Sequence, residues 1–241
     1  MKLTFVKFIF ALCVFAALFV FASCTGSTTQ ETTSEYVYIP SVETTAVSQP
    51  ESKINIDTSW QKNYEVEYIY YNAEQTEGQL NISEKRHSTA FVVEYLNTNA
   101  KLYYEKSGKD TDYYVIMPKE SKQAYSKLKD SNFSDLSSMF MKLSTVSASL
   151  PSQNNVLYMY DEKVAGRDCH KYIQRAYSDG ELTQSVYVWV DIEYGFAAKC
   201  EAYDAKNKKT TYWEISSFSA GDVSETETFV DLSLYDFKEK N

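Results

Sequence analysis

Residues 64–70 have the sequence Tyr-Glu-Val-Glu-Tyr-Ile-Tyr, and this short stretch decides the fold class of the chain. Successive side chains of a β-strand point to opposite faces of a sheet, so Tyr64, Val66, Tyr68 and Tyr70 share one face. The period of two predicts a half-buried strand whose apolar face must be covered by another part of the fold.

Alternation of the same kind continues before and after the centre of the chain. The chain as a whole contains 21 tyrosines. Tyrosine together with Val, Ile, Phe and Thr is typical of a half-buried pleated surface. The dipeptide Asp179-Gly180 stands between two such runs and predicts a tight hairpin. Before the centre, the apolar positions are Phe91, Val93 and Tyr95, then Leu102 and Tyr104, then Tyr113, Val115 and Met117. After the centre, the expected strands are Val156–Glu162, Cys169–Tyr177, Gln184–Asp191, Phe196–Asp204 and Thr210–Phe218.

The centre of the chain changes to a helical pattern. Pro118 opens a stretch rich in Lys, Gln, Ala and Leu that ends at Asp130, and proline suits the first turn of a helix. Ser134 can cap a second helix, which Pro151 ends. Its apolar side chains recur at three- and four-residue spacing and are Leu136, Met139, Phe140, Leu143 and Val146. Strands, two helices and more strands predict an α+β fold in which the helical stripe packs on one face of an antiparallel sheet.

Residues 1–23 have the features of a secretory signal peptide. Lys2 and Lys7 precede an unbroken apolar run over residues 8–22, which is shorter than the roughly 20 residues of a comfortable membrane span. The end of this run, Phe21-Ala22-Ser23-Cys24, resembles a bacterial lipobox. A lipobox implies that Cys24 is diacylated and becomes the first residue of the mature protein. An ordinary signal peptide, or an uncleaved anchor with an incidental Cys24, is the alternative.

Residues 24–57 are expected to comprise the lipidated cysteine and a disordered tether. Between Thr25 and Ser52, twelve of 28 residues are Ser or Thr. Such a segment cannot bury enough apolar surface to offset its conformational entropy. Tyr36–Ile39 interrupts it and is either part of the tether or an edge strand of the domain. The remaining residues, 58–238, suit one globular domain.

The chain is acidic. Its formal net charge is −9 at pH 7, and removal of the signal, which carries Lys2 and Lys7, takes that charge to −11. A charge of this sign argues against a nucleic-acid partner and against electrostatic docking on anionic lipid. Attachment to the extracytoplasmic face of the cell membrane is therefore expected to come from the acyl groups on Cys24.

A local pattern in the second half of the chain resembles the LolA-like family of lipoprotein carriers and their lipoprotein relatives. The pattern begins with Gly-Arg-Asp-Cys-His-Lys-Tyr over residues 166–172 and continues through Val186–Asp191, Tyr194–Phe196, Lys199–Asp204 and Trp213–Ile215. The similarity in element order extends over residues 60–235. It implies a strongly curved antiparallel half-barrel closed over the two helices, with an apolar cavity between sheet and helices. The soluble carriers are not lipidated, so the resemblance implies a stationary relative rather than a shuttle.

No motif in the chain indicates catalysis, a metal or a cofactor. His87 and His170 lie far apart in the sequence, without a nucleophile motif, a metal-ligand spacing or a phosphate loop. We therefore expect a protein that is not an enzyme. Cys169 and Cys200 remain to form a disulfide, which an extracytoplasmic location permits. An intervening strand would hold them about 9.5 Å apart, too far for a disulfide in a regular sheet, so this pairing stays open.

Two functions fit these observations. In the first, the domain binds a lipid, an acyl chain or a lipidated peptide in an apolar cavity. In the second, the protein is an envelope sensor or assembly factor that contacts another envelope protein through its surface, and its interior is a filled core. Carbohydrate stacking on exposed tyrosines is a third hypothesis. The expected ligand-contacting residues are Tyr68, Phe91, Val93, Tyr104, Val115, Met117, Leu136, Met139, Phe140 and Leu143.

Overall fold

The computed structural model describes residues 53–55, 57–73, 79–97, 100–107, 110–116, 123–130, 139–149, 151, 156–234 and 236–238. The chain divides into two units, Met1–Val47 and Ser48–Asn241, and all of these residues belong to the second unit. The predicted signal peptide, Cys24, most of the tether and Tyr36–Ile39 lie outside the described residues.

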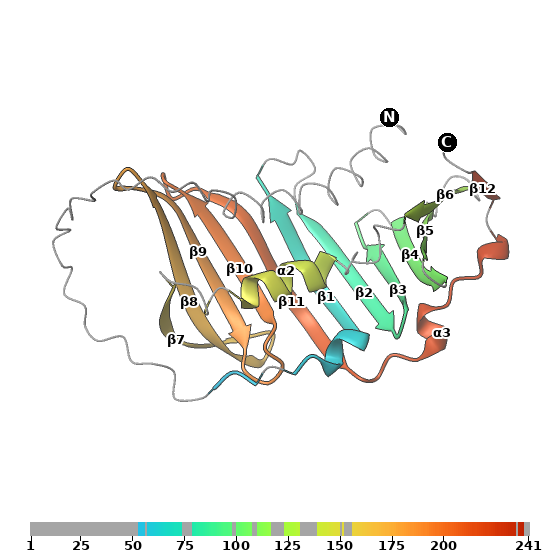
Figure 1. Ribbon diagram of the computed structural model, residues 1–241, viewed down its shortest axis with the longest axis horizontal. Coiled ribbons are helices and arrows are strands. Elements are labelled where there is room, and N and C mark those ends of the chain that lie inside the picture. Colours follow the sequence, from blue (N-terminus) through green and yellow to red (C-terminus); the bar gives the residue numbers. More distant parts are fainter. Residues whose placement is uncertain are drawn as a thin grey trace, which may run out of the picture. The chain divides into compact units, whose positions relative to one another are not determined.

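The described strands form one sheet, in the order β12-β6-β5-β4-β3-β2-β1-β11-β10-β9-β8-β7 (Figure 1). Neighbouring strands are antiparallel, except that β12 and β6 are parallel. The bounds are β1 Asn63–Asn72, β2 Leu80–His87, β3 Ala90–Tyr95, β4 Ala100–Ser107, β5 Asp110–Ile116, β6 Gln123–Asp130, β7 Val156–Val164, β8 Arg167–Ser178, β9 Glu181–Asp191, β10 Ala197–Asp204, β11 Lys209–Ala220 and β12 Asp236–Lys238.

Two meanders, β1–β6 and β7–β11, meet where β1 pairs with β11. All five strands expected after the centre of the chain are present, with small differences at their ends. The predicted hairpin is also confirmed, because Asp179 and Gly180 connect β8 to β9 with φ angles of 52° and 80°. Positive φ at both central residues is the geometry that matches the twist of a two-residue hairpin.

The sheet is strongly curved at its β7 end. Strand β7 contacts β11, although β8, β9 and β10 separate the two strands in the sheet order. Register shifts interrupt several pairs, including β7–β8 at Tyr158/Tyr160, β9–β10 at Ala197/Lys199 and β1–β11 at Glu67/Tyr68. An extra residue on one strand bends it and increases its twist, which lets a sheet curl. The curvature agrees with the expected half-barrel.

Helix α2 (Met139–Ala148) lies across one face of the sheet and contacts β9 and β10 (Figure 1). Its Phe140 side chain is fully buried and lies among aromatic rings contributed by the short 3-10 helix η1 (Ser59–Lys62) and several strands. The centroids of these rings lie 5.6–6.3 Å from that of Phe140, and the rings belong to Trp60, Tyr64, Tyr68, Phe196, Trp213 and Phe218. The strand alternation that begins at Tyr64 thus faces the helix, as the sequence predicts.

The C-terminal segment lies against the opposite face of the sheet. It contains the one-turn helix α3 (Glu225–Thr228), which contacts β2 and β3, and the 3-10 helix η4 (Leu232–Leu234). Val230 and Leu232 pack on a small cluster formed by Val92, Tyr103 and Tyr114 of β3, β4 and β5. Further along the chain, β12 pairs with β6, so residues 236–238 form the far edge of the described sheet.

The helix expected from Pro118 to Asp130 is wrong. Residues 123–130 form β6, which pairs with β5 on one side and β12 on the other. The Lys, Gln, Ala and Leu of this stretch favour a helix only weakly, and hydrogen bonding to two neighbouring strands overrides such a preference. The second helix is confirmed for Met139–Ala148, whereas Ser134 and Leu136 lie outside the described residues. The fold is therefore the predicted α+β arrangement, with one helix longer than a turn among the described residues.

Candidate functional site

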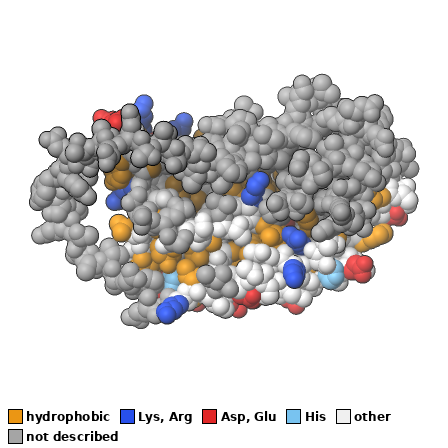
Figure 2. Space-filling model, viewed as in Figure 1, with side chains coloured by type: hydrophobic (Ala, Val, Ile, Leu, Met, Phe, Trp, Pro, Cys, Tyr) orange, Lys and Arg blue, Asp and Glu red, His pale blue; other side chains and the backbone are white. Residues whose placement is uncertain are grey.

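The face of the sheet that carries α2, called here the α2 face, holds a continuous set of apolar side chains over β1–β4. Cross-strand pairs such as Tyr68 with Ile82, Ile82 with Tyr95 and Val93 with Leu102 place these residues on one face. Figure 2 shows hydrophobic side chains gathered on this side of the molecule. The buried apolar members are Tyr64, Val66, Tyr68, Tyr70, Leu80, Ile82, Phe91, Val93, Tyr95 and Leu102. Two charged residues share this face, the buried Glu84 and the half-buried Arg86.

The residues expected to contact a ligand are brought together only in part. Tyr68, Phe91 and Val93 lie on the α2 face, and the strand register puts Tyr104 and Val115 in line with them. The side chains of Tyr104 and Val115 are not described, and Met117 and Leu136 lie outside the described residues. In α2, Phe140 belongs to the packed aromatic core, while Met139 and Leu143 are half-buried. Among the helix residues, Met139 and Leu143 are therefore the better candidates for a ligand contact.

Helix α2 is about 15 Å long, because an α-helix rises 1.5 Å per residue over its ten residues. It packs on β9 and β10, whereas Phe91 of β3 and Leu102 of β4 are also buried, with 5% and 2% of their surface exposed. In the strand order, β3 and β4 lie four and five positions away from β10. Among the described contacts of α2, none reaches β3 or β4.

A buried carboxylate joins α2 to the sheet. Glu84 of β2 is completely buried, and its Oε1 accepts hydrogen bonds from the Tyr68 hydroxyl at 2.6 Å and from the backbone N–H of Phe140 at 3.1 Å. Its Oε2 lies 3.4 Å from the Tyr64 hydroxyl. Burial, and then the negative charge of Glu84, raise the pKa of Tyr68 well above its usual value. A carboxylate beside the first turn of a helix also interacts favourably with the positive end of the helix dipole. The sequence offered no signal for this role, because Glu84 occupies an inward position within a strand.

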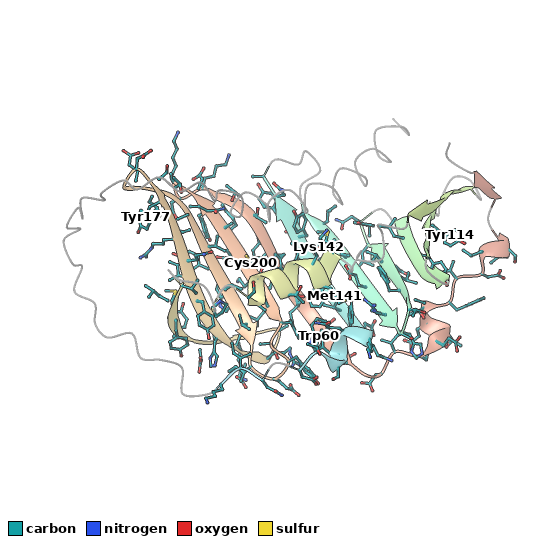
Figure 3. The ribbon with its side chains drawn as sticks, viewed as in Figure 1. Trp60, Tyr114, Met141, Lys142, Tyr177 and Cys200 are labelled. Carbon is teal, nitrogen blue, oxygen red and sulfur yellow. The ribbon has the colours of Figure 1, made fainter. Side chains whose placement is uncertain are left out.

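Arg86 lies two residues further along the same strand and the same face. Its Nε donates to the carbonyl of Ser88 at 3.2 Å, and one terminal nitrogen lies 3.1 Å from the Sδ of Met141 in α2. The guanidinium carbon is 5.7 Å from the centroid of the Phe91 ring. Figure 3 labels Met141 on α2 together with Trp60, which belongs to the aromatic core. The positively charged guanidinium of Arg86 thus lies next to α2 and beside the apolar side chains of the α2 face.

The opposite face of β7–β11 carries lysines between aromatic rings and glutamates. Lys171 and Lys199 place their ammonium groups 4.5 and 4.8 Å from the centroid of the Trp189 ring, and Lys199 also pairs with Glu214 at 3.0 Å. Trp189 is only 3% exposed, so it offers no open ring for a sugar. The Trp189 indole N–H donates to Glu162 at 2.7 Å. These side chains satisfy one another, and the carbohydrate hypothesis gains no support from them.

Exposed apolar side chains gather at the other edge of the sheet. Strand β7 is the last strand in the order, and Leu157, Met159 and Tyr160 are 47%, 37% and 45% exposed. Tyr177 and Leu182, beside the β8–β9 hairpin, are 61% and 36% exposed. Unpaired strand edges with exposed apolar side chains can accept a strand from another chain.

Both histidines have structural partners. His170 is fully buried in β8, and its Nδ1 lies 2.5 Å from Oδ1 of Asp161 in β7. His87 Nδ1 lies 2.8 Å from the carbonyl oxygen of Val223, at the start of the C-terminal segment. Among the described residues there is no group of three or more His, Cys, Asp or Glu side chains that could hold a metal ion.

Cys169 and Cys200 are both free and buried. They lie in β8 and β10, and β9 separates them through the pairs Cys169 with Asp191 and Cys200 with Val188. The disulfide left open in the sequence is therefore not formed. Burial raises the pKa of each thiol to about 12, and a hydrogen bond between Cys200 and Ser147 of α2 opposes this rise in Cys200.

Within the described part of the chain, no helix has the length and apolarity needed to cross a membrane.

No protein-family model and no curated protein matches the chain. Several solved structures are similar to the chain at low sequence identity. MucB has 12% sequence identity and a TM-score of 0.41 over 71% of this chain, and the match spans 58% of the MucB chain.

An uncharacterized conserved protein from Thermus thermophilus matches with 11% identity and a TM-score of 0.42, over 76% of this chain and 93% of that protein. A LolA superfamily protein from Nitrosomonas europaea matches with 12% identity and a TM-score of 0.31, over 71% and 91% of the two chains. A LolA superfamily protein is thus one of the solved structures that are similar to this chain.

Proposed function

We propose that the protein is a non-catalytic binding protein of the cell envelope, whose domain holds the acyl chain of a lipid or of a lipidated peptide on the α2 face. The observation that supports this most is that α2 does not extend over Phe91, Val93 and Leu102 of β3 and β4, called here the apolar row. Helix α2 packs on β9 and β10 and reaches β1 and β2 through the contacts of Phe140 with Tyr68 and Glu84. An acyl chain can pack on these apolar side chains, because it brings no polar group that would need a hydrogen-bond partner there.

Attachment to the membrane is part of the proposal. The apolar run over residues 8–22 would direct export, and Cys24 would carry the acyl groups that hold the protein on the extracytoplasmic face. The segment from Cys24 to residue 57 would act as a tether. Its last residues lie against the domain, because the Asn55 N–H donates to the carbonyl of Ile192 at 2.9 Å.

The test uses the full chain, purified from membranes under mild conditions and analysed by mass spectrometry for co-purified lipid. We expect at least one acyl-containing molecule to accompany the protein, in addition to the covalent modification of Cys24. Met139→Trp should reduce the amount of this molecule, because it adds bulk at a half-buried position of α2. Tyr177→Trp is the matched control, because it alters an exposed hairpin far along the chain from α2. A protein that carries no lipid, and takes up no fluorescent fatty acid, would contradict the proposal.

A second function is supported by the exposed edge of β7. In this alternative, the protein is an envelope sensor or assembly factor, and a partner protein adds an extended segment to β7 beside Leu157 and Tyr160. A photo-crosslinking residue at position 157, compared with one at the exposed position Leu96, tests it in living cells. A discrete crosslinked partner at position 157 and none at position 96 is the expected result. Equal crosslinking at both positions would count against this interface.

A further inference from the structure

Arg86 is the one positively charged residue that β1, β2 and β3 place on the α2 face. The register pairs it with Tyr64 of β1 and with Phe91 of β3, two residues whose side chains are buried on that face. The neighbouring Lys85 points to the opposite face, where it pairs with Glu65 at 2.8 Å and Glu227 at 3.3 Å. The two adjacent cations of β2 therefore have different surroundings.

The guanidinium of Arg86 has no carboxylate within ion-pair distance among the described residues. Its partners there are a carbonyl, a thioether and a ring, contributed by Ser88, Met141 and Phe91. Glu84 lies on the same face, but its oxygens accept from Tyr68, Tyr64 and Phe140. An arginine has five N–H donors in a planar fork suited to carboxylate, and the described residues engage only Nε and one terminal nitrogen of Arg86.

The apolar row begins directly beside this guanidinium. Phe91 is opposite Arg86 in β3 and pairs with Tyr104 of β4, and Val93 pairs with Leu102. Phe91, Val93 and Leu102 are 5%, 3% and 2% exposed. One cation, half-buried beside an apolar row, matches a molecule with one anionic head and one alkyl tail.

We propose that the α2 face binds a long-chain fatty acid, with its carboxylate on Arg86 and its tail along Phe91, Val93 and Leu102. This inference rests on the proposed function and adds the chemistry of the head group. A single guanidinium beside a single apolar row favours one carboxylate on one chain over a phospholipid with two chains. The diacylated cysteine of a lipidated peptide offers no anion at this position, so the inference also separates the two ligand classes.

The test uses the full chain in nanodiscs of a neutral phospholipid, with a photoreactive palmitic acid analogue and the methyl ester of the same molecule as probes. Labelled peptides are then identified by mass spectrometry. We expect the carboxylate probe to label peptides from β2–β4 and α2 at about one tenth of the concentration that the ester needs, as one charge-assisted hydrogen-bonded contact implies. In Arg86→Gln, labelling by the carboxylate probe should need the same concentration as labelling by the ester. Arg86→Lys should retain part of the difference between the two concentrations.

Lys85→Gln is the matched control, since it removes a cation from the next residue on the opposite face and should leave both probes unchanged. If Arg86→Gln keeps the tenfold preference for the carboxylate, the head group does not lie on Arg86 and the inference is overturned, while ester labelling still supports acyl binding. If phosphatidylglycerol displaces the probe at lower concentration than palmitate does, the ligand is a phospholipid and the fatty-acid assignment is wrong. If neither probe labels this face, the proposed function itself fails.

Discussion

The hydroxyl of Tyr68 donates a 2.6 Å hydrogen bond to the carboxylate of Glu84, and both side chains are buried, with 1% and 0% of their surface exposed. The same carboxylate oxygen accepts the backbone N–H of Phe140. Strand β1, strand β2 and helix α2 therefore meet at one polar point inside an aromatic core. A buried charge is tolerated only where hydrogen bonds replace its water, and here the hydroxyls of Tyr64 and Tyr68 and the N–H of Phe140 approach it.

Replacement of Glu84 by alanine should lower the free energy of unfolding by about 2–4 kcal/mol, because buried donors lose their acceptor and a cavity is left. Urea unfolding of the full chain measures the change. Glu65→Ala is the control, because it removes a partly exposed ion pair with Lys85 from the other face and should cost less than about 1 kcal/mol. Similar losses for the two variants would show that Glu84 does not anchor α2.

Phe140→Ala should reduce stability by about 3–5 kcal/mol, the range for a large buried aromatic side chain. The phenyl ring of Phe140 is fully buried and contacts six other aromatic rings. The neighbouring variant Met139→Ala removes a half-buried side chain and should have a clearly smaller effect. Thermal unfolding followed by near-ultraviolet circular dichroism reports both variants, since the aromatic cluster supplies the signal.

The thiols of Cys169 and Cys200 should resist alkylation in the folded protein at pH 8. Burial raises the pKa of each thiol to about 12, so the reactive thiolate is a small fraction at that pH. Iodoacetamide labelling followed by peptide mapping should leave both residues unmodified without denaturant and modify both in urea, without prior reduction. A requirement for reduction before the labelling in urea would reveal the disulfide that this fold separates by a strand.

Glu227 should titrate far below an ordinary glutamate. Hydrogen bonds from the Ser224 backbone N–H and hydroxyl, and then from Lys85, lower the pKa of Glu227 to about 2. A carboxylate whose pKa is depressed by folding stabilises the fold above its unfolded value of about 4.5, and that contribution is lost as the pH falls towards 2. Carboxyl carbon chemical shifts from NMR give the pKa directly. In Ser224→Ala the pKa of Glu227 should rise towards its ordinary value, whereas an ordinary value in the unmodified protein would show that the capping box does not form.

Cys24→Ala should release the mature protein from the membrane, because a chain with net charge −11 after signal removal and a polar tether has no other expected attachment. Fractionation of cells after an alkaline wash measures this. Retention of a mature-sized variant in the membrane pellet would contradict lipid anchoring at Cys24. Retention of the precursor alone would mean that the signal serves as an uncleaved anchor.

Local sequence signals predicted the strands well where period and packing agree. The alternation at Tyr64–Tyr70 became β1 with its tyrosines inward, and Asp179-Gly180 became the predicted turn. The same kind of reasoning failed at residues 123–130, because a helix preference of a few tenths of a kcal/mol per residue is smaller than the gain from pairing with β5 and β12. β12 comes from the end of the chain, more than 100 residues away, and local sequence does not reveal such a neighbour.

The sequence by itself determined the class of the domain, since period-two alternation, turn dipeptides and one amphipathic helix admit few arrangements other than a sheet with a helix on one face. Only the tertiary structure decided which polar residues are inside. The spacing of Glu84 and Arg86 in the sequence says that they share a face of the strand but does not say which face. Their inward placement follows from the register of β2 with β1 and β3. Register is set by the packing of whole faces, and a shift of one residue would have turned Glu84 and Arg86 outward, so contacts between distant strands assign them their roles.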